Sequence, residues 1–225
     1  EAVANQKLFF EELFVYKIKK TEALKAISKK GFTHLKYFAH GKRGIIHTAI
    51  HSAFLKEKKI AIKTKKEGSE AIGRIENEGK WLKKLNKIGI GPRLLMAEEL
   101  FLAYEFVEGV FFPDYLAKAG KKESFRIIHE LLEQCYRMDC MLIDKEEMHH
   151  PLKHIIVAIE DNKPTPYLLD FERMNSSEKP KNVTQFCVYI VGDFIVSLMK
   201  AKGVELNREE ILEAAAGKKA DLIAC

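Results

Sequence analysis

The sequence predicts an α+β fold in which a small antiparallel sheet with one helix is followed by a mostly helical region built around one hairpin. Two patterns support this fold class. Short apolar runs bounded by glycine or charged residues fill residues 32–64 and 93–106, which is typical of strands. Apolar side chains recur at three- and four-residue steps over residues 69–88 and again after residue 113, which is typical of helices.

The N-terminal part of the chain predicts helices and then a strand meander. Residues 5–29 carry apolar side chains at loosely helical spacings, so residues 1–31 are expected to be a helical extension packed on the next lobe. Strands are predicted at 34–38, 44–53, 59–64, 93–97 and 101–106, with a helix over 69–88. Residues 32–109 would then form a first lobe.

The C-terminal part predicts mostly helices. Helices are expected over 114–119, 123–142, 182–200 and 208–216, because apolar residues form stripes along these segments. Two strand candidates, 155–159 and 167–170, flank a turn at residues 161–164, so a hairpin is predicted there. Residues 110–225 would form a second lobe.

Composition limits the class of protein and its partners. The chain has 225 residues, 47% of them hydrophobic, and its 31% charged residues are spread along its length, which predicts a globular protein. The net charge of +6 favours polyanionic ligands such as nucleotide phosphates or RNA, although lysine-rich surfaces are also typical of thermophilic proteins. Four cysteines without CxxC spacing suit reduced thiols, and therefore a cytoplasmic protein.

No apolar run approaches the roughly 20 residues that span a bilayer, so no membrane segment is expected. The first residue is Glu1, and no basic region with an apolar stretch follows it, so no signal peptide is predicted. The native start is expected to have been removed.

Two motifs in the strand meander suggest a phosphate site. Gly41 and Gly44 bound a hairpin turn whose backbone N–H groups could approach phosphate oxygens, and Ile46 just after it could cover an adenine ring. An ordinary hairpin turn is the alternative. Lys63 ends the apolar strand that begins at Ile60, and an inward-pointing lysine there could bind phosphates, although many lysines simply end strands.

The following helix and strand add a carboxylate and a crossover. Glu78 lies on the same helix face as Trp81, Leu82 and Leu85, so it is predicted to point inward, whereas Glu76 is predicted to be solvated. Residues 104–109 run from an apolar strand into an acidic, glycine-ended crossover, whose backbone groups could hydrogen-bond an adenine edge.

A third carboxylate lies in the second lobe. Asp170 follows the apolar pair Leu168 and Leu169 and precedes Phe171. A hard divalent metal that bridges phosphates needs an oxygen ligand of this kind. Asp170 is therefore the candidate metal ligand.

Together and in this order, these motifs resemble the eukaryotic-like protein kinase superfamily, especially its minimal microbial branch. That branch includes the RIO kinases, the kinase partner of the tRNA-threonylcarbamoylation complex, and predicted archaeal Ser/Thr protein kinases. The resemblance spans about residues 32–200 and is strongest around Lys63, Glu78 and Asp170 and in the Gly-Ile-Gly-Pro turn at 89–92. It implies a two-lobed protein-kinase-like fold with a reduced second lobe.

The resemblance implies that ATP and Mg²⁺ or Mn²⁺ are held between the two lobes. Lys63, oriented by Glu78, would hold the α- and β-phosphates, the glycine turn would fold over them, and Asp170 would bind the metal. Tyr104 would lie at the back of the pocket. The implied ATP-binding residues are Gly41, Lys42, Arg43, Gly44, Ile46, Ala61, Lys63, Glu78, Tyr104, Glu105 and Val107.

The catalytic loop departs from the family pattern. Lys145 stands where most kinases have the His of their H-x-D motif, and Glu147 aligns with the Asp, which makes Glu147 the candidate catalytic base beside Lys63 and Asp170. His154 is the candidate second metal ligand, although it lies farther from the base than the family's Asn does. Asp144 is a rival for the base.

An alternative assigns no catalytic role to the loop histidines, His149, His150 and His154; a zinc site made from them is less favoured because no Cys lies nearby.

Three functions remain open. The first is phosphoryl transfer to a protein Ser or Thr, or to water. The second is a nucleotide-binding pseudokinase that acts as a switch or assembly factor, which the altered loop favours. The third is an RNA-associated module that uses lysines of the extension and of the strands, namely Lys17, Lys19, Lys20, Lys29, Lys30 and residues 56–66. Only a short segment separates Asp170 from the next helix, so peptide substrates would lack their usual platform.

Overall fold

The computed structural model describes residues 22–41, 44–54, 59–65 and 74–222, and it divides the chain into two compact units. The first unit contains the chain up to Asn86 together with Pro92–Phe106, and the second contains Lys87–Gly91 and the chain from Val107 onward. Most of the predicted N-terminal extension, residues 1–21, lies outside the described residues. The domain boundaries predicted from the sequence therefore stay predictions.

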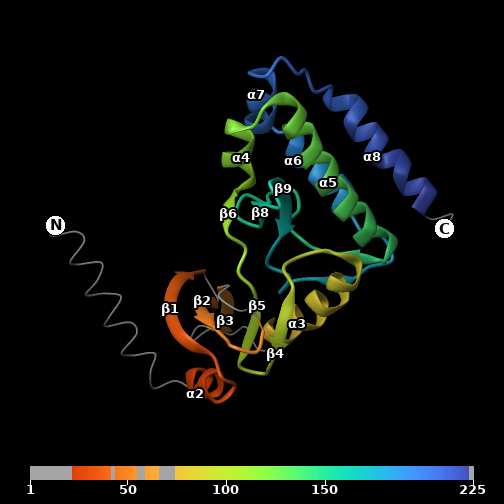
Figure 1. Ribbon diagram of the computed structural model, residues 1–225. Coiled ribbons are helices and arrows are strands. Elements are labelled where there is room, and N and C mark those ends of the chain that lie inside the picture. Colours follow the sequence, from red (N-terminus) through yellow and green to blue (C-terminus); the bar gives the residue numbers. More distant parts are fainter. Residues whose placement is uncertain (1–21, 42–43, 55–58, 66–73, 223–225) are drawn as a thin grey trace. The chain divides into compact units, whose positions relative to one another are not determined.

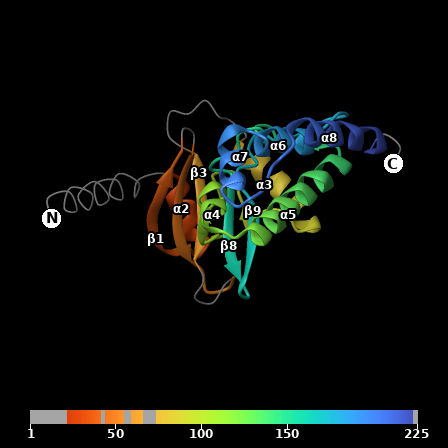
Figure 2. The ribbon, with the colours of Figure 1, turned by 90° about the horizontal axis from the view of Figure 1, so that it is seen from above.

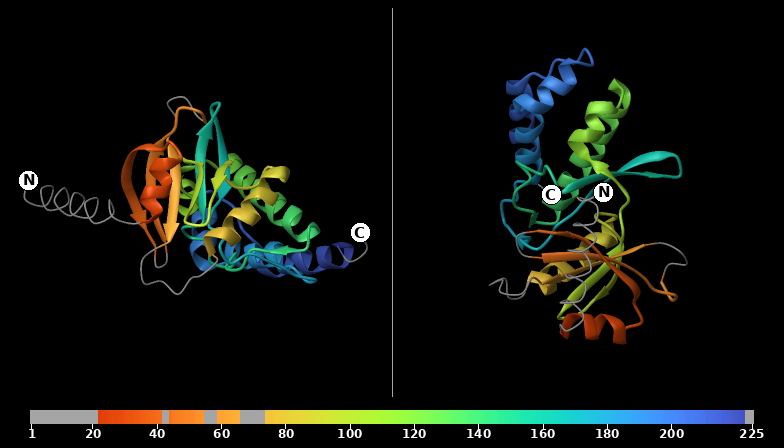
Figure 3. Two further views of the ribbon diagram at one scale, coloured as in Figure 1. Left: turned by 90° about the horizontal axis from the view of Figure 1, so that it is seen from below. Right: turned by 90° about the vertical axis from the view of Figure 1, so that its left-hand side faces the viewer.

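The first unit is a five-stranded antiparallel sheet with a helix on each face (Figures 1 and 3). The strand order is β1-β2-β3-β5-β4. The elements are α2 (Glu22–Lys29), β1 (Thr33–His40), β2 (Gly44–Ile50), β3 (Ile60–Lys65), α3 (Arg74–Leu85), β4 (Leu94–Ala97) and β5 (Phe101–Glu105); a 3₁₀ turn, η1 (Asn86–Ile88), follows α3.

Helix α2 covers one face of this sheet. Its buried residues Leu24 and Ile27 share a hydrophobic core with Ile60 and Ile62 of β3. Gly31, at φ +86°, ends the helix, and the N–H of Phe32 donates to the carbonyl of Ile27. This positive-φ glycine after the last turn is a common helix C-terminus, because glycine adopts that conformation without a steric penalty.

The second unit is mostly helical around a three-stranded sheet in the order β6-β8-β9. Helix α5 packs on α6, and α6 packs on α8 (Figure 2). Its elements are β6 (Gly109–Phe111), α4 (Phe112–Lys118), α5 (Lys121–Cys140), β7 (Ile143–Asp144), β8 (Ile155–Glu160), β9 (Lys163–Leu168), β10 (Asn175–Ser176), α6 (Asn182–Ile190), α7 (Asp193–Lys200) and α8 (Arg208–Leu222).

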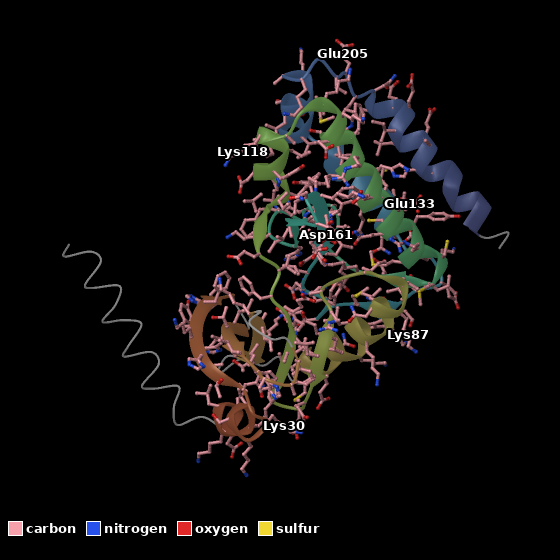
Figure 4. The ribbon with its side chains drawn as sticks, in the orientation of Figure 1. Lys30, Lys87, Lys118, Glu133, Asp161 and Glu205 are labelled. Atoms are coloured by element: carbon pink, nitrogen blue, oxygen red, sulfur yellow. The ribbon has the colours of Figure 1, made fainter. Side chains whose placement is uncertain are left out.

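The predicted hairpin is confirmed as β8 and β9. Asp161 and Asn162 form its tip with φ of 47° and 62°, and Asp161 is labelled in Figure 4. Two positive-φ residues in a two-residue loop match the right-handed twist of the flanking strands. The second strand begins at Lys163, earlier than predicted, and it ends at Leu168, so Asp170 is not part of it.

The single helical segment predicted over residues 182–200 is wrong in one respect: it forms two helices, α6 and α7, bent by 59°. The break lies at Val191 and Gly192, where the Gly192 N–H donates to the carbonyl of Tyr189. A Cβ on Gly192 would lie 3.1 Å from that carbonyl oxygen, so a larger residue at this corner would require a small shift of the backbone.

One more prediction is corrected in α5. Phe125 belongs to the apolar pattern of that helix in the sequence, yet it is exposed.

No single helix among the described residues is long and apolar enough to cross a bilayer; the bent pair α6 and α7 passes such a test by length and composition only. Much of α6 is buried inside the second unit.

Candidate functional site

A buried ion pair joins the predicted lysine and glutamate. Lys63 lies on β3 and Glu78 on α3, and the Lys63 Nζ is 2.6 Å from Glu78 Oε2. The two side chains are only 10% and 4% exposed. Glu76, two residues before Glu78, is exposed. The structure therefore brings together the two residues that the sequence paired and separates them from the solvated carboxylate.

The candidate nucleotide residues of the first unit share one face of the sheet. Ile46 is directly opposite Lys63 in the β2–β3 register, and Ala61 is opposite Tyr104 in the β3–β5 register. Residues directly opposite each other on antiparallel strands point to the same face, and Ala61 and Lys63 alternate with the core residues of β3. Ile46, Ala61, Lys63 and Tyr104 thus lie on the face opposite α2.

The glycine turn closes the β1–β2 hairpin next to this lysine. The N–H of Gly41 donates to the carbonyl of Gly44 at 2.9 Å. A Cβ on Gly44 would lie 3.3 Å from Lys63 Cε and 3.3 Å from the Thr64 carbonyl oxygen. Glycine therefore lets the turn run close to the lysine side chain. Lys42 and Arg43 lie outside the described residues.

The predicted adenine contacts fall at the end of β5. The Glu105 N–H already donates to the carbonyl of Arg93 at 2.9 Å, and the next N–H, of Phe106, donates to the carbonyl of Lys59. Val107 follows in the second unit. The contribution of Glu105 and Val107 to adenine binding stays a prediction.

In the second unit, Asp170 is held in an unusual backbone conformation. Its φ is +61°, which Asp adopts more readily than most non-glycine residues. The Lys145 ammonium donates to the Asp170 carbonyl at 3.0 Å and lies 5.4 Å from the centre of the Phe171 ring. Lys145 is buried. The Lys145 side chain therefore helps to fix the backbone at Asp170.

The Asp170 carboxylate is accessible and lies beside His154. Asp170 Oδ2 is 3.6 Å from His154 Nε2, with the side chains 36% and 24% exposed. The carboxylate suits Mg²⁺ or Mn²⁺, which prefer oxygen ligands, whereas an imidazole nitrogen is a less typical ligand for Mg²⁺. The Asp170 carboxylate is therefore of the ligand type that a hard divalent cation prefers, and the ligand role of His154 stays a prediction.

The candidate base, Glu147, forms an ion pair with Arg173, in the segment that follows Asp170. Glu147 has φ +67°, and its carbonyl accepts the N–H of His150 at 3.0 Å. Its carboxylate is 43% exposed. The rival, Asp144, lies in β7, and its Oδ1 is buried. Accessibility therefore favours Glu147 over Asp144.

A buried polar network anchors this loop to two helices. Asn182, at the start of α6, accepts the Lys145 N–H at 2.8 Å and donates to the Ile143 carbonyl and to Asp139 Oδ1, each at 2.6 Å. Asp139, on α5, also accepts the N–H groups of Asn182 and Val183. Burial raises the pKa of the Asp139 carboxyl, and these hydrogen bonds partly offset the rise. The loop therefore has a defined backbone course.

The segment between Asp170 and α6 is tied to the same region. Strand β10 pairs with β7 through Asn175 and Asp144, and the Ser177 N–H donates to the Leu142 carbonyl at 2.9 Å. The Met174 N–H donates to the Phe171 carbonyl. This short connection is thus held at several points along its length.

Sequence reasoning missed Arg173, Asp139 and Asn182. Asp139 offered a signal, since it is a carboxylate among the apolar positions of α5, and a buried carboxylate needs hydrogen-bond partners. Arg173 offered none, because its partner Glu147 is distant in the sequence.

No family model matches the chain, and no curated protein matches it. Solved structures do. The Rio2 kinase of Chaetomium thermophilum, in a complex described as ADP/Mg²⁺-phosphoaspartate, is similar with a TM-score of 0.60 at 14% identity, over 88% of this chain and 75% of that one. A second structure of the same kinase gives a TM-score of 0.59 at 13% identity, over 88% and 76%. The chain therefore has the protein-kinase-like fold.

Proposed function

We propose that the chain binds ATP with a divalent metal and transfers the γ-phosphoryl group to a Ser or Thr hydroxyl of a protein. The observation that carries the proposal is the buried Lys63–Glu78 ion pair on the sheet face that also holds Ile46, Ala61 and Tyr104. A buried lysine held by a helix glutamate is the arrangement that kinases use to bind the α- and β-phosphates. The kinase-like fold supports the same assignment.

The chain's own residues account for the chemistry as follows. Lys63 binds the phosphates, and Asp170 would hold the metal. A divalent metal held there would supply positive charge to offset the negative charge that develops on the phosphate oxygens during transfer. A bond forms between the acceptor oxygen and the γ-phosphorus while the bond from that phosphorus to the β–γ bridging oxygen breaks, and ADP leaves. The hydroxyl proton passes to the Glu147 carboxylate, which Arg173 holds in place.

A nucleotide-dependent switch without turnover is the second candidate. The observation that favours it is the pairing of Glu147 with Arg173, because the carboxylate oxygen that accepts from the guanidinium is already engaged when a substrate hydroxyl arrives. RNA association, the third function predicted from the sequence, stays a prediction. Several of its lysines, among them Lys17, Lys19 and Lys20, lie outside the described residues.

Calorimetric titration with a non-hydrolysable ATP analogue tests the proposal. In magnesium, Asp170→Asn is expected to lose about tenfold or more in affinity, the equivalent of roughly 1.4 kcal/mol for one charged ligand. When a chelator replaces magnesium, the affinity of Asp170→Asn for the analogue should match that of the parent. Asn tolerates the positive φ of this position, so the fold should survive.

The matched control is Asp161→Asn, at the exposed tip of the β8–β9 hairpin (Figure 4), which should bind like the parent in both conditions. Equal losses of Asp170→Asn with and without magnesium would show that Asp170 is structural. Absence of binding by the parent itself would reject the proposal.

A further inference from the structure

The second unit has a surface hollow of about 590 Å³ beside the candidate catalytic loop. Its walls come from the end of β6 and the start of α4, from the loop after Met148, and from the corner between α6 and α7. Figures 1 and 2 show α7 next to α4 and α6, in agreement with their contacts. All of the lining residues belong to the second unit.

Exposed apolar side chains gather in this hollow. Phe111, Leu152, Val188 and Phe194 are 39%, 36%, 42% and 58% exposed, and all four line it. Single exposed apolar residues are ordinary, but a contiguous group marks an interaction surface. A small molecule would be enclosed by its site, whereas these side chains stand partly in solvent, which favours a protein partner.

The hollow adjoins the candidate catalytic loop, and that loop is hydrogen-bonded to helix α6. Gln185 Oε1 accepts the N–H of Met148, the residue after Glu147, at 2.9 Å. Val188 and Tyr189, about one helical turn farther along α6, line the hollow. His149 and His150 of the loop line it too. A partner seated there would therefore be held next to the segment that carries the candidate base.

Charges around the hollow indicate a polypeptide rather than a lipid surface. Asp114 and Asp193 lie in the first turns of α4 and α7, and Lys153 lies on the loop. A surface that binds anionic lipid is rich in lysine and arginine, whereas this rim has both signs. A peptide can supply both signs around an apolar anchor.

We propose that this hollow docks the protein that accepts the phosphoryl group, by taking a bulky apolar side chain flanked by charges of both signs. The proposal rests on the proposed function. It also explains how a chain with only a short, tied segment after Asp170 could hold a protein substrate, because the docking contact would replace the missing platform.

The probe is a library of random twelve-residue peptides displayed on phage and selected against the full chain. Selected peptides, made synthetically with a fluorophore, are titrated against the parent, Phe194→Asp and Phe125→Asp by anisotropy. Phe194 lines the hollow, whereas Phe125 is a similarly exposed phenylalanine on α5 that does not. We expect peptides with a bulky apolar residue, an affinity loss of about tenfold or more in Phe194→Asp, and none in Phe125→Asp.

A second measurement links the peptide to a serine-containing acceptor through a Gly/Ser linker. The KM for this fusion should rise in Phe194→Asp, while the rate at saturating fusion stays near that of the parent. If the parent fails to bind metal–ATP, the proposed function falls, but the peptide affinities still decide the docking site.

Four results would overturn the docking proposal. The parent selects no peptide with an apolar anchor, or Phe194→Asp binds the peptides as tightly as the parent. Sedimentation shows a dimer of the parent that Phe194→Asp dissociates, which would assign the surface to a second copy. Vesicles of phosphatidylglycerol and phosphatidylcholine bind the parent but not Phe194→Asp, which would assign it to lipid.

Discussion

At the scale of single residues, a substitution of Glu147 tests whether the chain catalyses phosphate transfer or ATP hydrolysis. Glu147→Gln removes the proposed proton acceptor but keeps the size of the side chain, so ATP affinity should stay near that of the parent. Phosphate transfer or hydrolysis should fall by about 10²- to 10⁴-fold, the loss typical of a general base. The rate of ADP formation from ATP measures this, because transfer and hydrolysis both leave ADP.

Asp144→Asn is the comparison variant, and it should matter less because one Asp144 oxygen is buried. The opposite ranking would move the base to Asp144. A barely detectable turnover of the parent, unchanged in both variants, would favour the nucleotide-dependent switch.

His47 on β2 should make the first unit sensitive to acid. Its ring is buried, neither ring nitrogen has a hydrogen-bond partner among the described residues, and burial lowers its pKa from 6.5 to about 4. As the pH falls below 6.5, His47 takes up a proton in the unfolded chain but not in the folded chain. The free energy of unfolding is therefore at its full value above pH 6.5 and falls as the pH approaches 4.

We expect the free energy of unfolding of the parent to fall by roughly 2 to 3 kcal/mol more than that of His47→Leu between pH 7 and pH 4.5. Urea unfolding at the two pH values measures it. His129→Leu, at an exposed position on α5, should lose as much as the parent. Equal pH dependence of the parent and His47→Leu would show that His47 is solvated.

The burial of the Lys63–Glu78 pair also changes how Lys63 should be tested. Replacing the lysine with alanine would leave Glu78 buried without its partner, and breaking a buried pair costs about 3 to 5 kcal/mol. A loss of ATP binding in that variant could therefore come from unfolding. Asp170, the proposed metal ligand, has an accessible side chain, so its substitution tests the proposed function with less risk to the fold.

At the scale of elements, Asn182 should hold the catalytic loop to α6. Asn182→Ala would remove hydrogen bonds to the Lys145 N–H, the Ile143 carbonyl and Asp139 Oδ1, and a typical hydrogen bond contributes about 0.5 to 1.5 kcal/mol to stability. We expect a loss of about 1.5 to 4.5 kcal/mol in urea unfolding. Amide hydrogen exchange at residue 145 should quicken with it.

Asn175→Ala is the matched control, because Asn175 is exposed on β10. It should cost less than about 0.5 kcal/mol and leave exchange at residue 145 unchanged. If Asn182→Ala kept the parent's exchange there, the anchor would lie elsewhere.

The sequence predicted the helices and strands better than it predicted the breaks between them. The strands of the first unit, the helices and the hairpin could be placed because their apolar periodicity is local. The break at Gly192 was missed because α6 and α7 continue one apolar pattern. Lys63 and Glu78 could be paired because both lie on regular elements, whereas Arg173 and Glu147 meet only through the fold.

At the scale of the whole molecule, nucleotide binding should increase the thermal stability of the folded chain. A ligand that binds only the folded chain stabilises it by about 2.7 kcal/mol at a hundred times its dissociation constant. We therefore expect a magnesium–ATP analogue to raise the melting temperature of the parent. The rise should shrink in Asp170→Asn and persist in Asp161→Asn, and differential scanning calorimetry measures it. An unchanged melting temperature of the parent would count against nucleotide binding.

The connection between Asp170 and α6, which is hydrogen-bonded to its neighbours, bears on how the proposed enzyme would be controlled. Many kinases are turned on when a long loop after the metal-binding aspartate becomes ordered, often by phosphorylation. Here β10 pairs with β7, and Ser177 is bonded to Leu142, so this stretch is already fixed to its neighbours. If the chain transfers phosphate as proposed, the ordering of this stretch would not be its on–off signal, and control would depend on the supply of nucleotide and of partner.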